Sequence, residues 1–134
     1  LSLCKFSKYG NCKSLTIITY GNGLYLSIQA KKEIEKKINK KIQIIDLCWL
    51  SDVNFEEIIK SIGSCKKVLI VDECRRTGCH GEHILAQLSS IMSNETRVIL
   101  HAAEDCFIPI GEAAKITLPS KNSIIKQAIS LLDE

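Results

Sequence analysis

One stretch of this sequence places glycines where a backbone could approach a bound anion. An apolar run that begins at Leu15 ends in Thr19-Tyr20-Gly21-Asn22-Gly23, and a second apolar run ends in Asp46. In dinucleotide-binding units, glycines at such a turn let the backbone approach a pyrophosphate, and an acid about 20 residues later holds a ribose. One interpretation is therefore a nucleotide-binding domain that uses Gly21, Gly23 and Asp46.

The other interpretation of this stretch is a structural turn, and Leu26 favours it. The nucleotide fingerprint has a small residue three positions after its second glycine, where helix and strand pack closely, and Leu26 stands there instead. Glycine is also common after buried strands simply because the turn needs a positive φ.

A second stretch, Cys74 to His83, supplies two thiols, two imidazoles and the carboxylate of Glu82 within ten residues. These side chains are ligands that zinc prefers, so a metal-binding module is one alternative. No matching Cys pair lies elsewhere, however, and the glycines around His80 are typical of a loop that opens a helix. A nucleophilic thiol is a further alternative, because a helix start and nearby arginines would lower the pKa of Cys74 or Cys79.

Arg75 and Arg76 lie side by side within the same stretch. Two adjacent guanidinium groups suit the carboxylates of another protein surface, or an anion. The sequence predicts that they line a domain or subunit boundary; the alternative is two solvated charges.

Alternating strands and helices must position all these residues. Continuous apolar runs, typical of strands buried on both faces, occur at 15–20, 42–47, 68–71 and 97–100. Helical patterns lie between and after them, at 24–38, 55–62, 84–92 and 124–132. Asp52 or Asn54 is expected to cap the second helix, and Ser120 the last.

This alternation predicts an α/β sandwich with a parallel sheet and helices on both faces. The carboxyl ends of its strands should gather Tyr20 and Gly21, Asp46, residues 72–76 and residues 101–105 at one edge. The first dozen residues are expected to add a strand that pairs by a hairpin with the strand at 15–20.

Composition limits the class of protein. The chain has 134 residues and 46% apolar content, which fits one domain, and its net charge of +3 with 5% aromatics does not indicate a nucleic-acid partner. No apolar run approaches the roughly 18 residues of a membrane span. Seven cysteines, an odd number, lie mostly beside predicted elements, so reduced thiols in a cytoplasmic compartment are expected. A start at Leu1 predicts a domain excised from a longer chain.

Four segments in this order resemble the carboxy-terminal domain of transketolase-like enzymes. They are residues 15–23, Ile45-Asp46-Leu47, Val71-Asp72-Glu73 with residues 76–82, and residues 103–109. The closest likeness is to the beta subunit, or beta part, of thiamine-diphosphate-dependent 2-oxo acid dehydrogenases. Two places depart from the family pattern: Cys79-His80 replaces a glycine and an aromatic or small residue, and Cys106-Phe107 replaces a threonine-proline pair.

The resemblance implies a three-layer α/β/α sandwich, a transketolase C-terminal-like domain over residues 1–134, whose five-stranded sheet is mostly parallel with one antiparallel strand. It implies no cofactor, metal or catalytic residue in this domain, because thiamine diphosphate and magnesium bind elsewhere in the full-length enzyme. The domain's role would be to support subunit and domain assembly in a homodimer or heterotetramer, and to help dock the lipoyl acyltransferase core of a multienzyme complex. Branched-chain 2-oxo acids are slightly preferred over pyruvate as the expected substrate, and the location is the cytoplasm, or the mitochondrial matrix in a eukaryote. The candidate interface or carboxyl-edge residues are Tyr20, Gly21, Glu73, Arg75, Arg76, Glu82, Asp105 and Pro109.

Overall fold

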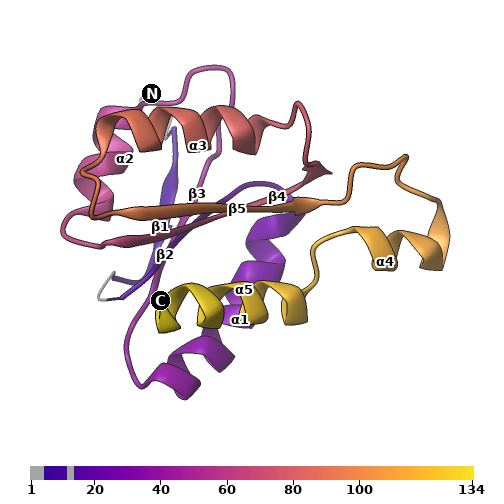
Figure 1. The fold of residues 1–134 in the computed structure, drawn as a ribbon, viewed down its shortest axis with the longest axis horizontal. Helices are drawn as coiled ribbons and strands as arrows, with labels where there is room; N and C mark the ends of the chain where they lie inside the picture. Colours follow the sequence, from indigo (N-terminus) through magenta and orange to yellow (C-terminus); the bar gives the residue numbers. More distant parts are fainter. Residues whose placement is uncertain (1–4, 12–13) are drawn as a thin grey trace.

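The computed structural model describes residues 5–11 and 14–134. Its centre is one five-stranded sheet with the strand order β1-β3-β2-β4-β5 (Figure 1). The strands are β1 (Ser7–Tyr9), β2 (Thr16–Thr19), β3 (Gln43–Asp46), β4 (Lys67–Arg75) and β5 (Arg97–Ala103). β1 runs antiparallel to β3, and the other neighbouring strands run parallel. This confirms the predicted mostly parallel sheet with one antiparallel strand.

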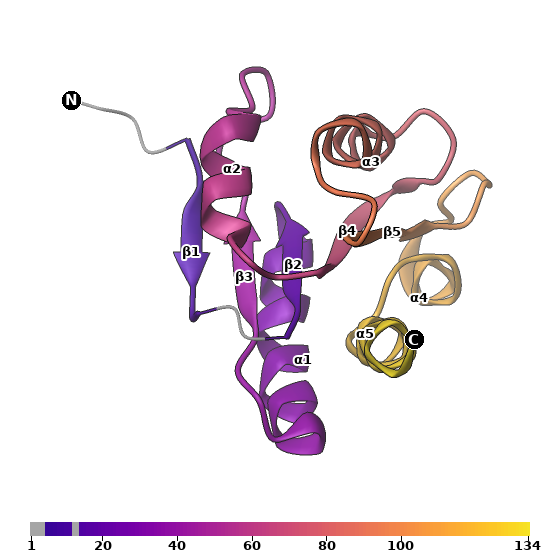
Figure 2. The same cartoon turned by 60° about the vertical axis from the view of Figure 1, so that its left-hand side comes forward.

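Helices cover both faces of the sheet, which gives the three layers seen in Figure 2. α1 (Asn22–Ile38) and α5 (Lys121–Asp133) pack on one face, and α2 (Phe55–Ile62) and α3 (His80–Ile91) pack on the other. Each face has its own apolar core because alternate residues of a strand point to opposite sides. In β2, for example, Ile17 belongs to the core under α1, and Ile18 belongs to the core under α3.

Two predicted helix caps are present. The side chain of Asn54 accepts a hydrogen bond from the backbone N–H of Glu57 at 3.1 Å, so Asn54 rather than Asp52 caps α2. Asp52 instead forms an ion pair with Lys5. At α5, Ser120 Oγ accepts from the N–H of Ser123, and Ser123 Oγ accepts from the N–H of Ser120, which makes a reciprocal capping box.

The predicted hairpin between the first strand and β2 is wrong. β1 pairs with β3, placing Ser7 opposite Asp46 and Tyr9 opposite Ile44. The reason is that β3 and β4 already occupy both sides of β2 as parallel neighbours, so the only place open to β1 is the outer edge of β3.

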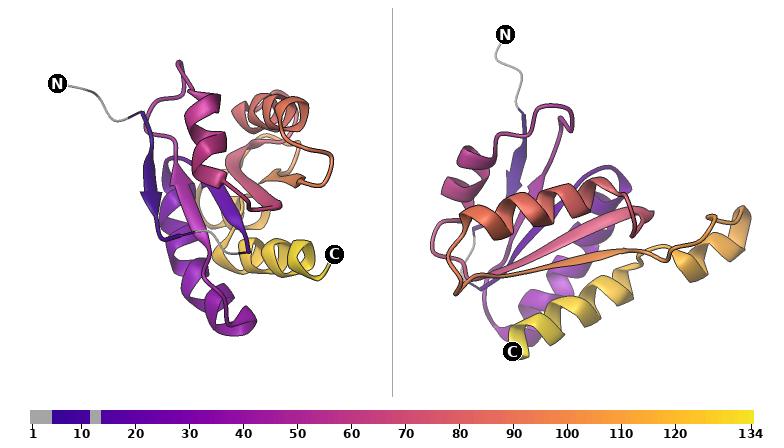
Figure 3. Two further views of the ribbon diagram at one scale, coloured as in Figure 1. Left: turned by 90° about the vertical axis from the view of Figure 1, so that its left-hand side faces the viewer. Right: turned by 45° about the horizontal axis from the view of Figure 1, so that its top comes forward.

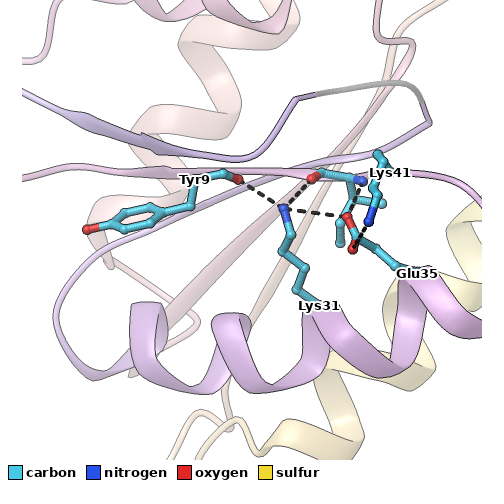
Figure 4. A network of polar contacts seen from close by, with 5 residues as sticks. Tyr9, Lys31, Glu35 and Lys41 are labelled. Carbon is cyan, nitrogen blue, oxygen red and sulfur yellow. Dashed lines mark hydrogen bonds and ion pairs between the residues drawn. The ribbon is translucent and has the colours of Figure 1, made fainter.

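A lysine on α1 holds β1 in this position. Lys31 Nζ donates to the carbonyl oxygens of Tyr9, at 3.1 Å, and Ile42, at 2.6 Å (Figure 4). Its charge is compensated by Glu35, whose carboxylate lies 3.5 Å from Lys31 Nζ and also accepts from the N–H of Ile42 and from Lys41. The group ties the edge strand, the start of β3 and α1 together.

After β5 the chain forms an arm, residues 104–117, that extends away from the sandwich (Figure 3). It contains a short 3-10 helix, η1 (Gly111–Ala113), and one turn of helix, α4 (Ala114–Thr117). The N–H of Glu104 donates to the carbonyl of Thr117 at 3.2 Å, which closes the base of the arm. The sequence patterns did not predict these elements.

Cys65 is disulfide-bonded, so the expectation of reduced thiols is wrong at this residue. Cys48, Cys74, Cys79 and Cys106 are free thiols.

Among the helices in the described ranges, none is long and apolar enough to cross a membrane.

Candidate interface at the carboxyl edge of the sheet

The carboxyl edge is organised around Asp72, a buried carboxylate in β4. Only 1% of Asp72 is exposed. Its Oδ1 accepts from the N–H of Cys74 and its Oδ2 from the N–H of Gly81, each at 2.8 Å. Gly81 is the second residue of α3, so the carboxylate receives one of the free amides at the start of that helix. A Cβ at Gly81 would lie 2.6 Å from Leu100 Cδ1 and 3.0 Å from Asp72 Oδ2, so only glycine fits this contact.

The ionisable groups around Asp72 are held in their neutral forms. Burial, with a hydrogen bond to Asp72, raises the pKa of the Tyr20 phenol far above its usual range. Burial and the charge of Asp72 also raise the pKa of Cys74, and burial raises that of Cys79. The expectation that the helix start and the neighbouring arginines lower these thiol pKa values is therefore wrong, because burial and a carboxylate outweigh them.

The imidazole rings of His80 and His83, in the stretch considered for metal binding, pack against each other and against neighbouring aromatic rings. Their centroids are 5.9 Å apart, and His80 lies edge-on to Tyr20 at 6.3 Å while His83 lies edge-on to Phe55 at 5.7 Å. Within residues 5–11 and 14–134, no group of three or more His, Cys, Asp or Glu side chains is placed to hold a metal ion. In the structure the Cys74 to His83 stretch forms the end of β4, a loop and the start of α3.

The glycine turn after β2 is used for packing. Gly21 has a φ of 57°, a conformation that favours glycine, and it precedes α1 without a side-chain cap. A Cβ at Gly23 would lie 2.3 Å from Thr19 Oγ1, the hydroxyl that donates to the carbonyl of Val71. Leu26 packs against the core under α1. These contacts favour the structural turn over the nucleotide site.

Asp46, the acid of the nucleotide interpretation, lies beside the turn. It is opposite Thr19 in the sheet, as the fingerprint would need. Burial raises the pKa of its carboxyl group, and the Cys48 thiol lies 3.7 Å from Oδ2.

Arg75 and Arg76 are adjacent in sequence but differ in their contacts. Arg76 is fastened to β5: its guanidinium donates to the carbonyl of Leu100 at 3.2 Å, and its backbone N–H donates to that of Ala103 at 3.1 Å. Arg75 is exposed and lines a shallow hollow with Thr77, Asp105, Cys106 and Phe107. Arg75 is thus the one free to meet a partner.

Asp105 joins the arm to the loop after β4. Its two carboxylate oxygens accept from the backbone N–H and the hydroxyl of Thr77, both at 2.7 Å. These bonds, with smaller contributions from Arg75 and Arg76, lower the pKa of Asp105. The sequence placed Asp105 at this edge but did not reveal its link to Thr77, because the two residues meet only through the pairing of β4 and β5.

The remaining residues that were predicted at this edge, Glu73, Glu82 and Pro109, do not form one cluster. Glu73 accepts from the side chain of Asn22 at 2.7 Å, and Glu82 accepts from the backbone N–H of Gly78 at 2.6 Å. Pro109 is half-buried on the arm. Each carboxylate therefore fixes a turn that begins a helix, α1 for Glu73 and α3 for Glu82.

The most exposed apolar surface lies on the arm, where no residue had been proposed for a site except Asp105 and Pro109. The exposed fractions are 95% for Phe107, 97% for Ile110 and 80% for Ile116. An apolar group of this kind that projects from a folded domain usually marks a contact with another protein surface. The sequence did contain a signal for this surface. Phe107, Ile110 and Ile116 are large apolar residues whose spacing fits neither the period of a strand nor that of a helix, so they were not expected to belong to the core.

Comparisons with known proteins agree with this architecture. A family model described as "Transketolase, C-terminal domain" matches residues 10–124. The chain is 32% identical over 128 residues to the pyruvate dehydrogenase E1 component subunit beta of Staphylococcus aureus strain Mu50, and 30% identical to that of Staphylococcus epidermidis strain RP62A. Each alignment covers 94% of this chain and 38% of the relative.

Solved structures share the fold. A split-gene transketolase, described as an inactive beta4 tetramer, superposes with a TM-score of 0.81 at 17% identity, over 96% of this chain and 42% of that one. A 2-oxoglutarate:ferredoxin oxidoreductase from Magnetococcus marinus superposes with a TM-score of 0.67 at 13% identity, over 98% of this chain and 20% of that one.

Proposed function

We propose, from the premise that the chain belongs to the transketolase C-terminal domain family, that it is the non-catalytic C-terminal domain of a thiamine-diphosphate-dependent 2-oxo acid dehydrogenase component. The observation that carries the proposal is the match to pyruvate dehydrogenase E1 beta subunits along 94% of the chain. The chain spans 38% of the length of those relatives, so the activity belongs to the larger protein.

In this proposal thiamine diphosphate and magnesium bind to other parts of the enzyme. The support for this is that the chain covers 38% of the relatives' length, which leaves most of those proteins to carry a cofactor site. When bound elsewhere, thiamine diphosphate supplies the carbanion chemistry of decarboxylation. The residues of this domain would hold neighbouring domains in place.

The assembly role rests on the arm and on Arg75. Phe107, Ile110 and Ile116 offer apolar area, and the exposed guanidinium of Arg75, which lines a hollow with Phe107, can bind a carboxylate. We propose that this surface contacts another domain or subunit of the same component, in a homodimer or in a heterotetramer with an alpha subunit. Docking of a lipoyl acyltransferase core, and a cytoplasmic location, are further parts of this proposal.

The substrate proposed is a 2-oxo acid. The names of the relatives favour pyruvate, and the sequence-based preference for branched-chain 2-oxo acids stays a prediction. Turnover of pyruvate and of 3-methyl-2-oxobutanoate by the assembled enzyme would distinguish them.

Two measurements test the proposal. In the full-length enzyme, Phe107→Ser with Ile110→Ser should reduce the assembled fraction in analytical ultracentrifugation, and Arg75→Ala should reduce it less. Lys60→Ala, an exposed charge on α2, is the control and should leave assembly unchanged. Unchanged assembly in all three variants would refute the interface.

The second measurement uses the 134-residue chain itself. Calorimetric titration with thiamine diphosphate and magnesium should give no saturable heat, and the chain should not turn over a 2-oxo acid. Saturable binding, or turnover, would show that the domain carries part of the active site.

A further inference from the structure

A groove opens at the amino edge of the sheet, on the opposite side from the arm. It lies between the C-terminal ends of α1 and α5, which neighbour each other under one face of the sheet (Figure 2), and the segment that leads into β4. Its charged lining consists of four lysines, Lys37, Lys40, Lys66 and Lys67, and one carboxylate, Asp133, and its apolar lining includes Ile129 and Leu132. The groove therefore combines an apolar strip with a concentration of positive charge.

Two of these lysines already have partners in the fold. Lys66 forms an ion pair with Glu95, and Lys67 Nζ donates to the carbonyl of Leu132 at 2.8 Å, near the end of α5. Lys37 and Lys40 differ: within the part of the chain that the structure describes, neither forms an ion pair. Both are exposed.

Two of the acidic side chains near these lysines, Glu33 and Glu35, already have cationic partners, whereas Asp133 leaves one carboxylate in the lining of the groove. Glu33 accepts from Lys121 at 2.6 Å, and Glu35 pairs with Lys31 and Lys41. Smaller hollows adjoin the groove and share its lining, one through Lys37 and Ile129 and one through Lys40; they add Lys126 and Lys41. The positive charge thus extends along the surface without equal compensation by local carboxylates.

The apolar lining separates this surface from an ordinary solvated helix face. Ile129 and Leu132 are partly buried against the core under α1, so part of each side chain remains open to the groove between the lysines. The long stems of lysine can add apolar contact while their ammonium groups reach a charged partner. A complementary ligand needs an apolar side chain at its centre and carboxylates on both sides.

We propose that this groove binds an acidic peptide segment of a partner protein, with one apolar residue against Ile129 and Leu132 and with acidic residues paired to Lys37 and Lys40. This interaction surface goes beyond the assembly role proposed above. The arm and the groove lie at opposite edges of the sheet, so both can be occupied at once.

The test uses the 134-residue chain and two fluorescein-labelled peptides of equal length and charge. One peptide alternates glutamate with leucine, and the other alternates glutamate with serine. Fluorescence anisotropy at low salt should show that the leucine peptide binds about tenfold more tightly, with affinity falling as salt screens the lysines. Equal affinity for the two peptides would show that only non-specific charge attraction holds them, and it would overturn the proposal.

Charge reversal then locates the site. The variant with Lys37→Glu and Lys40→Glu should bind the leucine peptide at least about tenfold more weakly. The matched control, Lys8→Glu with Lys60→Glu, changes the net charge equally at exposed positions outside the groove and should bind within about twofold of the unaltered chain. If both variants weaken binding equally, the groove is not the site. Lys37→Gln with Lys40→Gln replaces the first variant if that variant does not fold in a thermal melt.

An anionic membrane is the other surface that could attract these lysines. Co-sedimentation with phosphatidylserine vesicles should be weak and should not compete with the leucine peptide. Vesicle binding that Lys37→Glu with Lys40→Glu abolishes, together with displacement of the peptide by vesicles, would overturn the proposal in favour of a lipid surface.

Discussion

The carboxyl and amino edges of the sheet carry charge in opposite ways. At the carboxyl edge, the buried carboxylate of Asp72 receives backbone N–H groups from Cys74 and Gly81, and the phenol and thiols around it stay neutral. At the amino edge, Lys67 donates to the last turn of α5, while Lys37 and Lys40 form no ion pair within the described residues.

Helix polarity explains the difference. In a parallel α/β sheet, the helices begin at the carboxyl edge, where their free N–H groups favour acids, and end at the amino edge, where their free carbonyls favour cations. An acid at the carboxyl edge, such as Asp72, is therefore already hydrogen-bonded to backbone N–H groups of the domain itself. Lysines at the second edge are tolerated without a partner, and they remain available to a ligand.

The largest expected effect comes from the acid at the carboxyl edge. Asp72→Ala leaves two backbone N–H groups without an acceptor, one of them at the start of α3. We expect a loss of about 3 kcal/mol in the free energy of unfolding, measured by urea denaturation. The matched control is Asp46→Ala, because burial raises the pKa of Asp46 and the only described side-chain contact of its carboxylate is the Cys48 thiol. Equal losses would show that Asp72 has no special place at this edge.

Much of this arrangement follows from local sequence. Runs of branched apolar residues predict the buried strands, and the caps at Asn54 and Ser120 mark the helix starts, because each signal lies within a few residues of the structure it specifies. The family resemblance supplied the five-stranded, mostly parallel sheet with one antiparallel strand, which periodicity alone does not give, but it supplied no strand order.

The failures are non-local. The partner of β1 depends on which strand edge stays open after the parallel strands have paired, and nothing near Tyr9 records this. The apolar run at 68–71 gave only half of β4, which continues to Arg75 because its polar end still pairs with Ala103 of β5. The thiol pKa values were misjudged for the same reason: the arginines are adjacent in sequence, but Asp72 and burial dominate in space.

A smaller effect should separate paired from unpaired lysines on α1. Lys31→Met removes two hydrogen bonds to the carbonyls of Tyr9 and Ile42 and leaves Glu35 with less compensation (Figure 4). We expect a loss of about 1.5 kcal/mol and faster amide exchange in β1. Lys37→Met, on the same helix, should change stability by less than about 0.5 kcal/mol. A comparable loss in Lys37→Met would mean that the groove lysine is structural, which would weaken the contrast between the edges.

The smallest expected effect is a pH dependence at His101, near the carboxyl end of β5. Burial, with a smaller contribution from the charge of Arg76, lowers the pKa of His101, whose Nε2 lies 2.8 Å from Ser123 Oγ. Because the pKa is lower in the folded state than in the unfolded one, the unfolded chain binds more protons. His101 then contributes its full stability above the unfolded pKa of about 6.5 and loses it as the pH falls through the folded pKa. The unaltered chain should lose up to about 1 kcal/mol more than His101→Gln when unfolding is compared at pH 7.5 and at about pH 5. If the free energy of unfolding changes with pH in the same way in both proteins, burial does not lower the pKa of the His101 imidazole. The preference for neutral side chains would then be limited to the surroundings of Asp72.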